Sequence, residues 1–334
     1  MLGSSSAARL PSARWLALIL LLAACGTQSS STLSPSPNPT GVTAAASPSE
    51  QSAPRAPSVT PSPTSSPTSV PEPQTPVFVI VFENKDAAEI LSGNQAPYFA
   101  SLASVYAYAA NYRAITYPSQ PNYIALFSGS THGVTDNELY DITARSLADQ
   151  VDEAGLTWRV AVENVESGCF TGPFSLDGPD GEGIYSRKHN PAISFTPISR
   201  DPTRCANITN FTNFDPEAAD VTFIVPNNCH SMHDCSIAEG NAWLEAFLPR
   251  ILESDAYGQG GVVFITFDED RGDGDNYVAT IVVSDRAVRG AASERPYTHY
   301  SLLRSVQELL GLPCLAESCD AEPMSDLIEG LGAD

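Results

Sequence analysis

Five short apolar runs occur along the chain, and each is continuous, without alternation between apolar and polar positions. A continuous run of this length predicts a strand that is buried on both faces, as in a parallel sheet covered by helices. The runs are VFVIVF at 77–82, TWRVAV at 157–162, VTFIV at 221–225, VVFITF at 262–267 and VATIVV at 278–283.

Longer segments between these runs have the composition and spacing of helices. Gly311 and Pro313 follow the last of them, as residues that end a helix often do. The alternation predicts an α/β fold, with a central, mostly parallel sheet flanked by helices in one domain over 77–334. The helical segments are 96–110, 121–129, 142–155, 241–252 and 299–311.

The first 25 residues predict an export signal. Arg9 and Arg14 precede the apolar run WLALILLLAA, which is too short for an ordinary membrane span. The run ends in Leu-Ala-Ala-Cys at 22–25, which resembles the lipobox of bacterial lipoproteins; the alternative is a plain cleaved signal. We therefore expect an extracytoplasmic protein that is anchored to the cell membrane through lipidated Cys25.

Residues 26–76 predict a disordered tether between that anchor and the domain. They consist mainly of Ser, Thr, Pro and Ala, in runs such as PSPTSSPTSVPEPQTP. Such a segment buries too little apolar surface to offset the entropy lost on ordering.

The charge balance excludes one class of partner. The chain has 39 acidic against 17 basic residues and a formal net charge of -22. Nucleic-acid binding needs clustered Lys and Arg, so no nucleic-acid partner is expected. The same charge repels anionic substrates, so any site for a phosphate group needs a local cation.

Six cysteines follow Cys25, and an even number in an exported protein predicts disulfide bonds. Fifteen pairings are possible. The simplest joins Cys229 to Cys235 and Cys314 to Cys319, which leaves Cys169 with Cys205. A zinc site in the segment CHSMHDC at 229–235 is the alternative, but its cysteine spacing is unusual for zinc.

Acidic and amide residues follow the predicted strands. Glu83 and Asn84 come after the first, and Asp268 and Glu269 after the fourth. Because ligands bind at the carboxyl ends of parallel strands, these residues form a candidate site for one divalent cation, with Ca, Mg or Mn favoured by oxygen ligands. Glu163–Asn164, after the second strand, is interpreted as a cap.

The stretch YPSQPNY at 117–123 encloses Ser119 between two prolines. Such a serine is either an ordinary turn residue or a rigidly held nucleophile. Three of the five histidines lie beside other polar signals: His132, His233 and His299. A single histidine is more often structural than catalytic, so these three are candidates only.

Several motifs together resemble one known family. VFENKD, APYFASLA, YPSQPNYIALFSGSTHG, VPNNCHSMHDCS, ITFDED and YTHYSLLRSVQELLGL occur in this order over residues 77–313. They are similar to the phosphoesterase family that contains bacterial acid phosphatases and phospholipases C. The resemblance implies an alkaline phosphatase-like sandwich and a hydrolase that acts on small phosphoester substrates.

The resemblance also implies roles for matching residues. Ser119 corresponds to the nucleophile, and His233 and His299 to catalytic groups. Asn122 and His132 correspond to substrate-binding groups. The implied metal ligands are Glu83, Asn84, Ser119, Asp268 and Glu269.

Departures from the family pattern narrow the expected activity. Phospholipases C carry an Asp-His pair where this chain has Asp275–Asn276, and they have additional carboxyl-terminal domains. An acid-phosphatase-like phosphomonoesterase is therefore favoured, with a phospholipase C or other phosphodiesterase as the alternative. Two other hypotheses fit the sequence less well. A metal-free serine esterase would need a G-x-S-x-G turn, but the sequence around Ser119 has prolines where those glycines belong.

A non-enzymatic, lipidated solute-binding protein would usually have two similar lobes, but this chain predicts one continuous unit.

Overall fold

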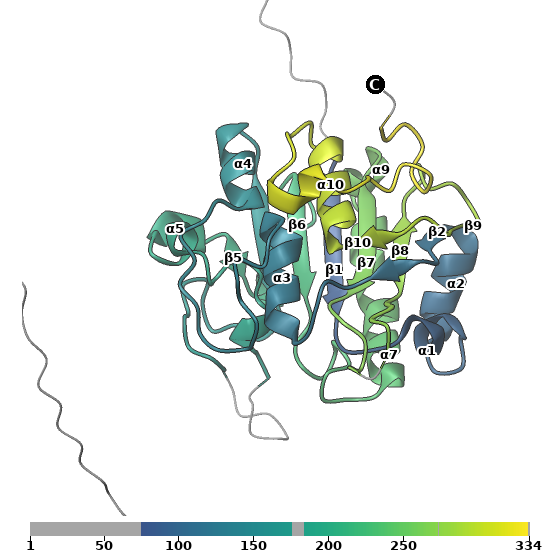
Figure 1. Ribbon diagram of the computed structural model, residues 1–334, viewed down its shortest axis with the longest axis horizontal. Coiled ribbons are helices and arrows are strands. Elements are labelled where there is room, and N and C mark those ends of the chain that lie inside the picture. The colour runs from purple at the N-terminus through teal and green to yellow at the C-terminus, as the bar shows by residue number, and fades with distance from the viewer. Residues whose placement is uncertain (1–74, 176–183, 273, 333–334) are drawn as a thin grey trace, which may run out of the picture. The chain divides into compact units, whose positions relative to one another are not determined.

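An eight-stranded sheet forms the centre of the fold in a computed structural model that describes residues 75–175, 184–272 and 274–332 (Figure 1). The strand order is β5-β4-β6-β1-β7-β8-β2-β9. The export signal, Cys25 and all but the last two residues of the predicted tether lie outside the described residues. The strands are β1 (Val77–Phe82), β2 (Ala107–Ala109), β4 (Trp158–Val162), β5 (Ile208–Thr209), β6 (Val221–Val225), β7 (Val262–Phe267), β8 (Thr280–Val283) and β9 (Ala291–Ser293).

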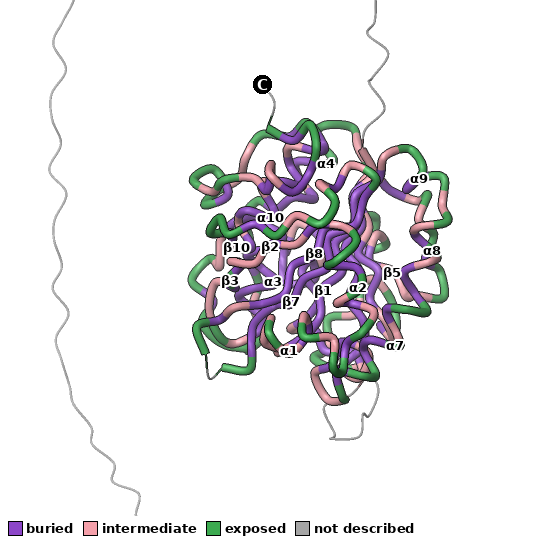
Figure 2. The backbone as a smooth tube through the Cα atoms, turned by 90° about the vertical axis from the view of Figure 1, so that its right-hand side faces the viewer, coloured by how far each residue is buried: buried purple, intermediate pink, exposed green. Residues whose placement is uncertain are grey.

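The sheet is mostly parallel, as predicted. Strands β5, β4, β6, β1 and β7 run in the same direction, and β8 is antiparallel to both of its neighbours. All residues of β1, β6, β7 and β8 are buried, which explains why these strands read as continuous apolar runs. Figure 2 shows the strands as a buried centre beneath more exposed helices and loops.

Helices cover both faces of the sheet. The ring of Phe127 in α3 packs edge-on against Phe223 of β6, whereas Phe82 of β1 packs against Phe99 of α2. Val79 is the register partner of Phe223, and Phe82 is three residues further on, so Phe82 points to the opposite face. The helices are α1 (Ala87–Leu91), α2 (Pro97–Val105), α3 (Ser119–Ser128), α4 (Leu147–Glu153), α5 (Thr196–Ser199), α6 (Pro202–Cys205), α7 (Ile237–Phe247), α8 (Pro249–Leu252), α9 (Asp255–Gly258) and α10 (His299–Leu309).

Short elements complete the described chain. A two-stranded parallel sheet pairs β3 (Tyr112–Arg113) with β10 (Tyr297–Thr298). Three 3₁₀ helices are η1 (Arg187–His189), η2 (Phe211–Asn213) and η3 (Ala316–Cys319). Within the described part of the chain, every helix is too short or too polar to cross a membrane.

Several predicted boundaries were wrong. The helix predicted at 96–110 ends at Val105, because Tyr106 leaves the helical conformation and 107–109 form β2. The helix predicted at 142–155 begins at Leu147, after a capping box made by Ser146 and Asp149. The segment 241–252 is divided between α7 and α8.

The predicted disulfide pairing is confirmed. Bonds join Cys169 to Cys205, Cys229 to Cys235 and Cys314 to Cys319. Because the thiols of Cys229 and Cys235 are joined, they are not zinc ligands.

Candidate active site

Ser119 begins α3 beside the carboxyl ends of β1 and β7. The preceding Pro118 is extended, and Pro121 falls in the first turn of the helix. Proline has no backbone N–H, and the N–H groups of the first turn have no acceptor within the helix, so Pro121 costs the helix no hydrogen bond. Ser119 is only 2% exposed. Its Oγ lies 3.2 Å from Oε1 of Glu269 and 3.4 Å from Oε2 of Glu83. The hydroxyl can therefore donate its proton to either carboxylate.

Asn84 and Asp268 complete the oxygen-rich side of the site. The backbone N–H of Asn84 donates to Oδ1 of Asp268 at 3.2 Å, and its side-chain amide donates to Oε1 of Glu269 at 2.8 Å. Asn84 adopts a φ of 51°, in the left-handed region that asparagine tolerates better than most residues. Oδ1 of Asn84 and Oδ2 of Asp268 are buried, and neither has a hydrogen-bond partner among the described residues.

Three carboxyl groups are crowded into this buried site. Burial, followed by the nearby charge of Asp268, raises the pKa of Glu83 well above its ordinary value. Burial and the charge of Asp268 also raise the pKa of Glu269 to about 8, and burial raises the pKa of Asp268 itself. Tyr123 donates a short hydrogen bond to Oε1 of Glu83. The arrangement favours a cation, which would offset the repulsion among the carboxylates.

The residues present fit a hard divalent cation by the chemistry of their donors. In residues 75–175, 184–272 and 274–332, no group of three or more His, Cys, Asp or Glu side chains has the arrangement of a metal cluster. The candidate donors here include an amide and a hydroxyl besides carboxylates. The two buried oxygens without partners, on Asn84 and Asp268, are the feature that a bound cation would satisfy.

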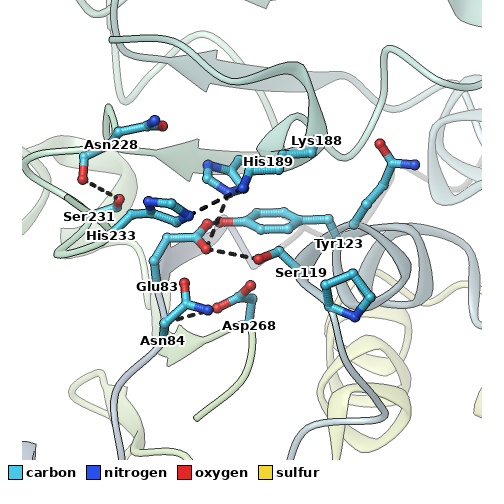
Figure 3. A network of polar contacts seen from close by, with 12 residues as sticks. Glu83, Asn84, Ser119, Tyr123, Lys188, His189, Asn228, Ser231, His233 and Asp268 are labelled. Atoms are coloured by element: carbon cyan, nitrogen blue, oxygen red, sulfur yellow. Dashed lines mark hydrogen bonds and ion pairs between the residues drawn. The ribbon is translucent and has the colours of Figure 1, made fainter. Parts of the chain in front are cut away.

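Basic residues occupy the other side of Glu83 (Figure 3). Nε2 of buried His189 lies 3.3 Å from Oε2 of Glu83. Nζ of Lys188 lies 3.2 Å from Nε2 of His233, and Nδ1 of His233 lies 2.5 Å from Oδ1 of Asp234. Burial, together with the neighbouring Lys188 and His233, holds the pKa of His189 well below its ordinary value.

The loop closed by the Cys229–Cys235 disulfide brings His233 to the site. The backbone N–H of Glu83 donates to the carbonyl of Ser231 at 2.9 Å, which fastens the loop to the end of β1. Glu163 accepts from the backbone N–H of Asn227 at 3.0 Å and contacts Nδ1 of His230 at 2.8 Å. Glu163 thus caps the turn at the start of this loop, in agreement with the cap that the sequence suggested.

His299 lies behind the site and not in it. It is fully buried; Nε2 donates to the backbone carbonyl of Asp268 at 2.7 Å, and Nδ1 accepts from the hydroxyl of Tyr112 at 2.9 Å. Both ring nitrogens therefore have protein partners. This geometry assigns His299 to positioning of Asp268 and gives no support to contact with substrate.

Asn122 lies at the site, whereas His132 does not. Nδ2 of Asn122 donates to Oε2 of Glu269 at 3.4 Å. Oδ1 of Asn122 accepts from the backbone N–H groups of Ile115 and Thr116 at 3.0 and 3.1 Å, so it fixes the turn before Ser119. His132 contacts Ser128 at 3.0 Å, at the far end of α3. A helical rise of about 1.5 Å per residue places Ser128 roughly 13 Å from the start of α3. The structure does not bring His132 to the nucleophile.

Sequence reasoning missed Tyr123, Lys188 and His189. Tyr123 is four residues after Ser119 on α3, so helical spacing alone places both on one face. Lys188 and His189 belong to η1, in a loop that follows no predicted strand, and no sequence signal marks them.

Comparisons with known proteins show the family of the chain. The profile of the Phosphoesterase family matches residues 78–313. A phosphatidylinositol-3-phosphatase from Mycobacterium tuberculosis (strain ATCC 25618 / H37Rv) is 31% identical over 258 residues, which cover 75% of this chain and 82% of that protein. A phosphate-repressible acid phosphatase from Penicillium chrysogenum is 30% identical over 239 residues, which cover 66% of this chain and 56% of the fungal protein. The chain thus spans little more than half of that fungal relative.

Solved structures share the architecture. The phosphonate monoester hydrolase of Agrobacterium radiobacter superimposes with a TM-score of 0.51 at 13% identity, over 77% of each chain. This likeness concerns the fold alone. The helix-flanked, mostly parallel sheet is the α/β architecture that the sequence predicted.

The family match and the phosphatase relatives define an enzyme of the phosphoester-hydrolase class. The chain belongs to the Phosphoesterase family.

Proposed function

We propose that this protein is a metal-dependent phosphomonoesterase with Ser119 as its nucleophile. The observation that carries the proposal is the contact of the buried Ser119 hydroxyl with Glu83 and Glu269, next to the unpartnered oxygens of Asn84 and Asp268. The relatives described above, a phosphatidylinositol-3-phosphatase and an acid phosphatase, support the choice of monoesters.

The side chains supply a balanced two-step hydrolysis. Oγ of Ser119 attacks phosphorus and forms an O–P bond, while the bond from phosphorus to the alcohol oxygen breaks. The serine proton passes to Glu269 or Glu83. His233, which takes up a proton at Nε2 when the substrate binds, gives that proton to the departing alcohol. Water then hydrolyses the phosphoserine, His233 takes back one proton, and Ser119 regains its own.

Asn84, Asp268, Glu83, Glu269 and Ser119 are the residues that would hold a divalent cation. When bound, such a cation would lower the pKa of the serine hydroxyl and offset the negative charge of the phosphoryl group.

The partners of Ser119 distinguish this reaction from carboxyl-ester hydrolysis. A serine esterase activates its serine with a histidine that is itself oriented by an acid. The Ser119 hydroxyl instead contacts two carboxylates.

A lipid-anchored, extracytoplasmic location is also part of the proposal. The three disulfides support the extracytoplasmic location because disulfides persist in oxidising compartments.

The test compares Ser119→Ala with Ser128→Ala, a matched change at a second buried serine of α3. Each purified protein is assayed on an aryl phosphate, a bis-aryl phosphate and an aryl acetate. The assays are run with chelator and after addition of Ca, Mg or Mn. We expect Ser119→Ala to lose about 10³-fold or more of the monoesterase activity while retaining its circular dichroism spectrum.

We expect Ser128→Ala to retain activity and chelator to abolish that of the wild type. Substantial monoesterase activity in folded Ser119→Ala would exclude this nucleophile. Full activity in chelator would exclude the metal, and turnover of the aryl acetate alone would favour an esterase.

A further inference from the structure

The chain contains only two lysines, Lys85 and Lys188, and both contact residues at the candidate active site. Nζ of Lys85 donates to the backbone carbonyls of Asn84 at 3.1 Å and Met232 at 2.8 Å. This lysine ties the end of β1 to the loop at 229–235. Lys85 therefore has a structural use for its ammonium group.

Lys188 has a different environment. Its ammonium contacts Nε2 of His233 at 3.2 Å, and no carboxylate in the described part of the chain lies within ion-pairing distance of it. An ammonium group only donates, so Nε2 of His233 accepts, and Nδ1 carries the hydrogen that points to Asp234. An imidazole accepts only one of the three ammonium hydrogens, which leaves donors for a ligand.

This pairing is unusual in a chain with a net charge of -22. Acidic side chains are abundant, yet Nζ of this half-buried lysine lies next to an imidazole nitrogen and not next to a carboxylate. The N–H groups of the ammonium that the imidazole does not accept can bind an anion. The geometry thus points to an anionic ligand at Lys188.

The neighbour of Lys188 in the chain connects it to Ser119. Nε2 of His189 lies 3.3 Å from Oε2 of Glu83, and the same carboxylate oxygen lies 3.4 Å from Oγ of Ser119. In Figure 3, Lys188 and His233 lie on the side of Glu83 opposite Asn84 and Asp268.

We propose that Lys188 binds a non-bridging oxygen of the phosphoryl group and thereby selects phosphomonoester dianions over phosphodiester monoanions. This inference rests on the proposed function. A monoester presents one more charged oxygen than a diester, and hydrogen bonds between charged groups are roughly twice as strong as neutral ones. Movement of the ammonium to the substrate also releases Nε2 of His233 for proton exchange.

The experiment compares Lys188→Gln, Lys188→Arg and Arg145→Gln. The last removes one positive charge from the exposed Arg145–Glu153 pair and serves as the charge-matched control. The kcat/KM values are measured for an aryl phosphate and a bis-aryl phosphate. We expect Lys188→Gln to lower the monoester value by about 10²-fold and the diester value by less than about 10-fold. Lys188→Arg retains most of the selectivity, and the control retains all of it.

A binding measurement separates this proposal from the proposed function. Titration calorimetry follows inorganic phosphate binding to Ser119→Ala with and without Lys188→Gln, at the same divalent cation concentration. We expect the second change to weaken phosphate binding by about 10-fold. Equal losses on monoester and diester, or unchanged phosphate affinity, would overturn the role of Lys188. Monoesterase activity that survives Ser119→Ala would instead overturn the proposed nucleophile and leave the phosphate titration interpretable.

Discussion

Replacement of His299 by alanine should damage the fold more directly than the chemistry. Its ring donates to the backbone carbonyl of Asp268 and accepts from the hydroxyl of Tyr112, and all of these groups are buried. In the variant, the Asp268 carbonyl and the Tyr112 hydroxyl lose these partners. Asp268 then becomes free to shift at the end of β7.

The loss in free energy of unfolding can be worked out from those two contacts. Leaving a buried polar group unsatisfied costs about 1–3 kcal/mol, so two such groups cost about 2–6 kcal/mol in free energy of unfolding. Tyr112→Phe is the matched control, because it removes only the contact remote from Asp268 and should cost about 1–2 kcal/mol. A total stability of roughly 5–15 kcal/mol leaves His299→Ala folded but weakened.

Urea unfolding followed by circular dichroism measures both variants, and kcat is measured below the unfolding transition. With a slope of about 3 kcal/mol/M, the midpoint of His299→Ala should fall by about 1–2 M without a change in slope. His299→Gln, which can donate to the Asp268 carbonyl through its amide, should recover part of the loss. An unchanged midpoint together with a 100-fold fall in kcat would refute the positioning role and restore His299 as a catalytic residue.

Two further predictions concern the loop at 229–235. Hydrogen bonding to its carboxylate partner raises the pKa of His230, so the stabilisation is complete below the ordinary value of about 6.5 and disappears as the pH rises through the folded-state pKa. His230→Gln should therefore cost at most about 1 kcal/mol in urea unfolding at pH 5.5 and less at pH 9, and a cost that grows with pH would contradict this sign. Serine replacement of both Cys229 and Cys235 should cost about 2 kcal/mol and also reduce kcat, because the disulfide closes the loop that carries His233, the proposed proton donor. The same change at Cys314 and Cys319, which close a loop of similar length, should cost similar stability and spare kcat; equal effects on kcat would show that the first loop has no special role.

The central strands could be predicted because burial on both faces leaves a strong pattern in the sequence. The outer strands leave a weaker one. Ala107–Ala109 consists of small residues and an aromatic next to a helical segment, so local propensity favoured continuing the helix. Pairing of β2 with β8 and β9 decides the outcome, and those partners lie far away in the sequence.

Part of the candidate site could also be predicted from the sequence and part could not. The ends of the buried strands could be located, and because β1 and β7 are parallel neighbours, Glu83 and Glu269 lie together beside Ser119. Lys188 reaches the site from a 3₁₀ turn whose position depends on the tertiary fold. The family resemblance implies a catalytic role for His299, whereas the structure shows that both of its ring nitrogens contact protein groups.

The scarcity of lysine has a practical consequence for handling the protein. Apart from the amino terminus, every primary amine in the 334 residues belongs to Lys85 or Lys188. Amine-directed coupling, crosslinking or acylation will therefore act beside the candidate active site or at the amino terminus, and not over the general surface. Immobilisation through amines will tend to block turnover, whereas the same reagents, used in the presence and absence of phosphate, provide a label for occupancy of the site.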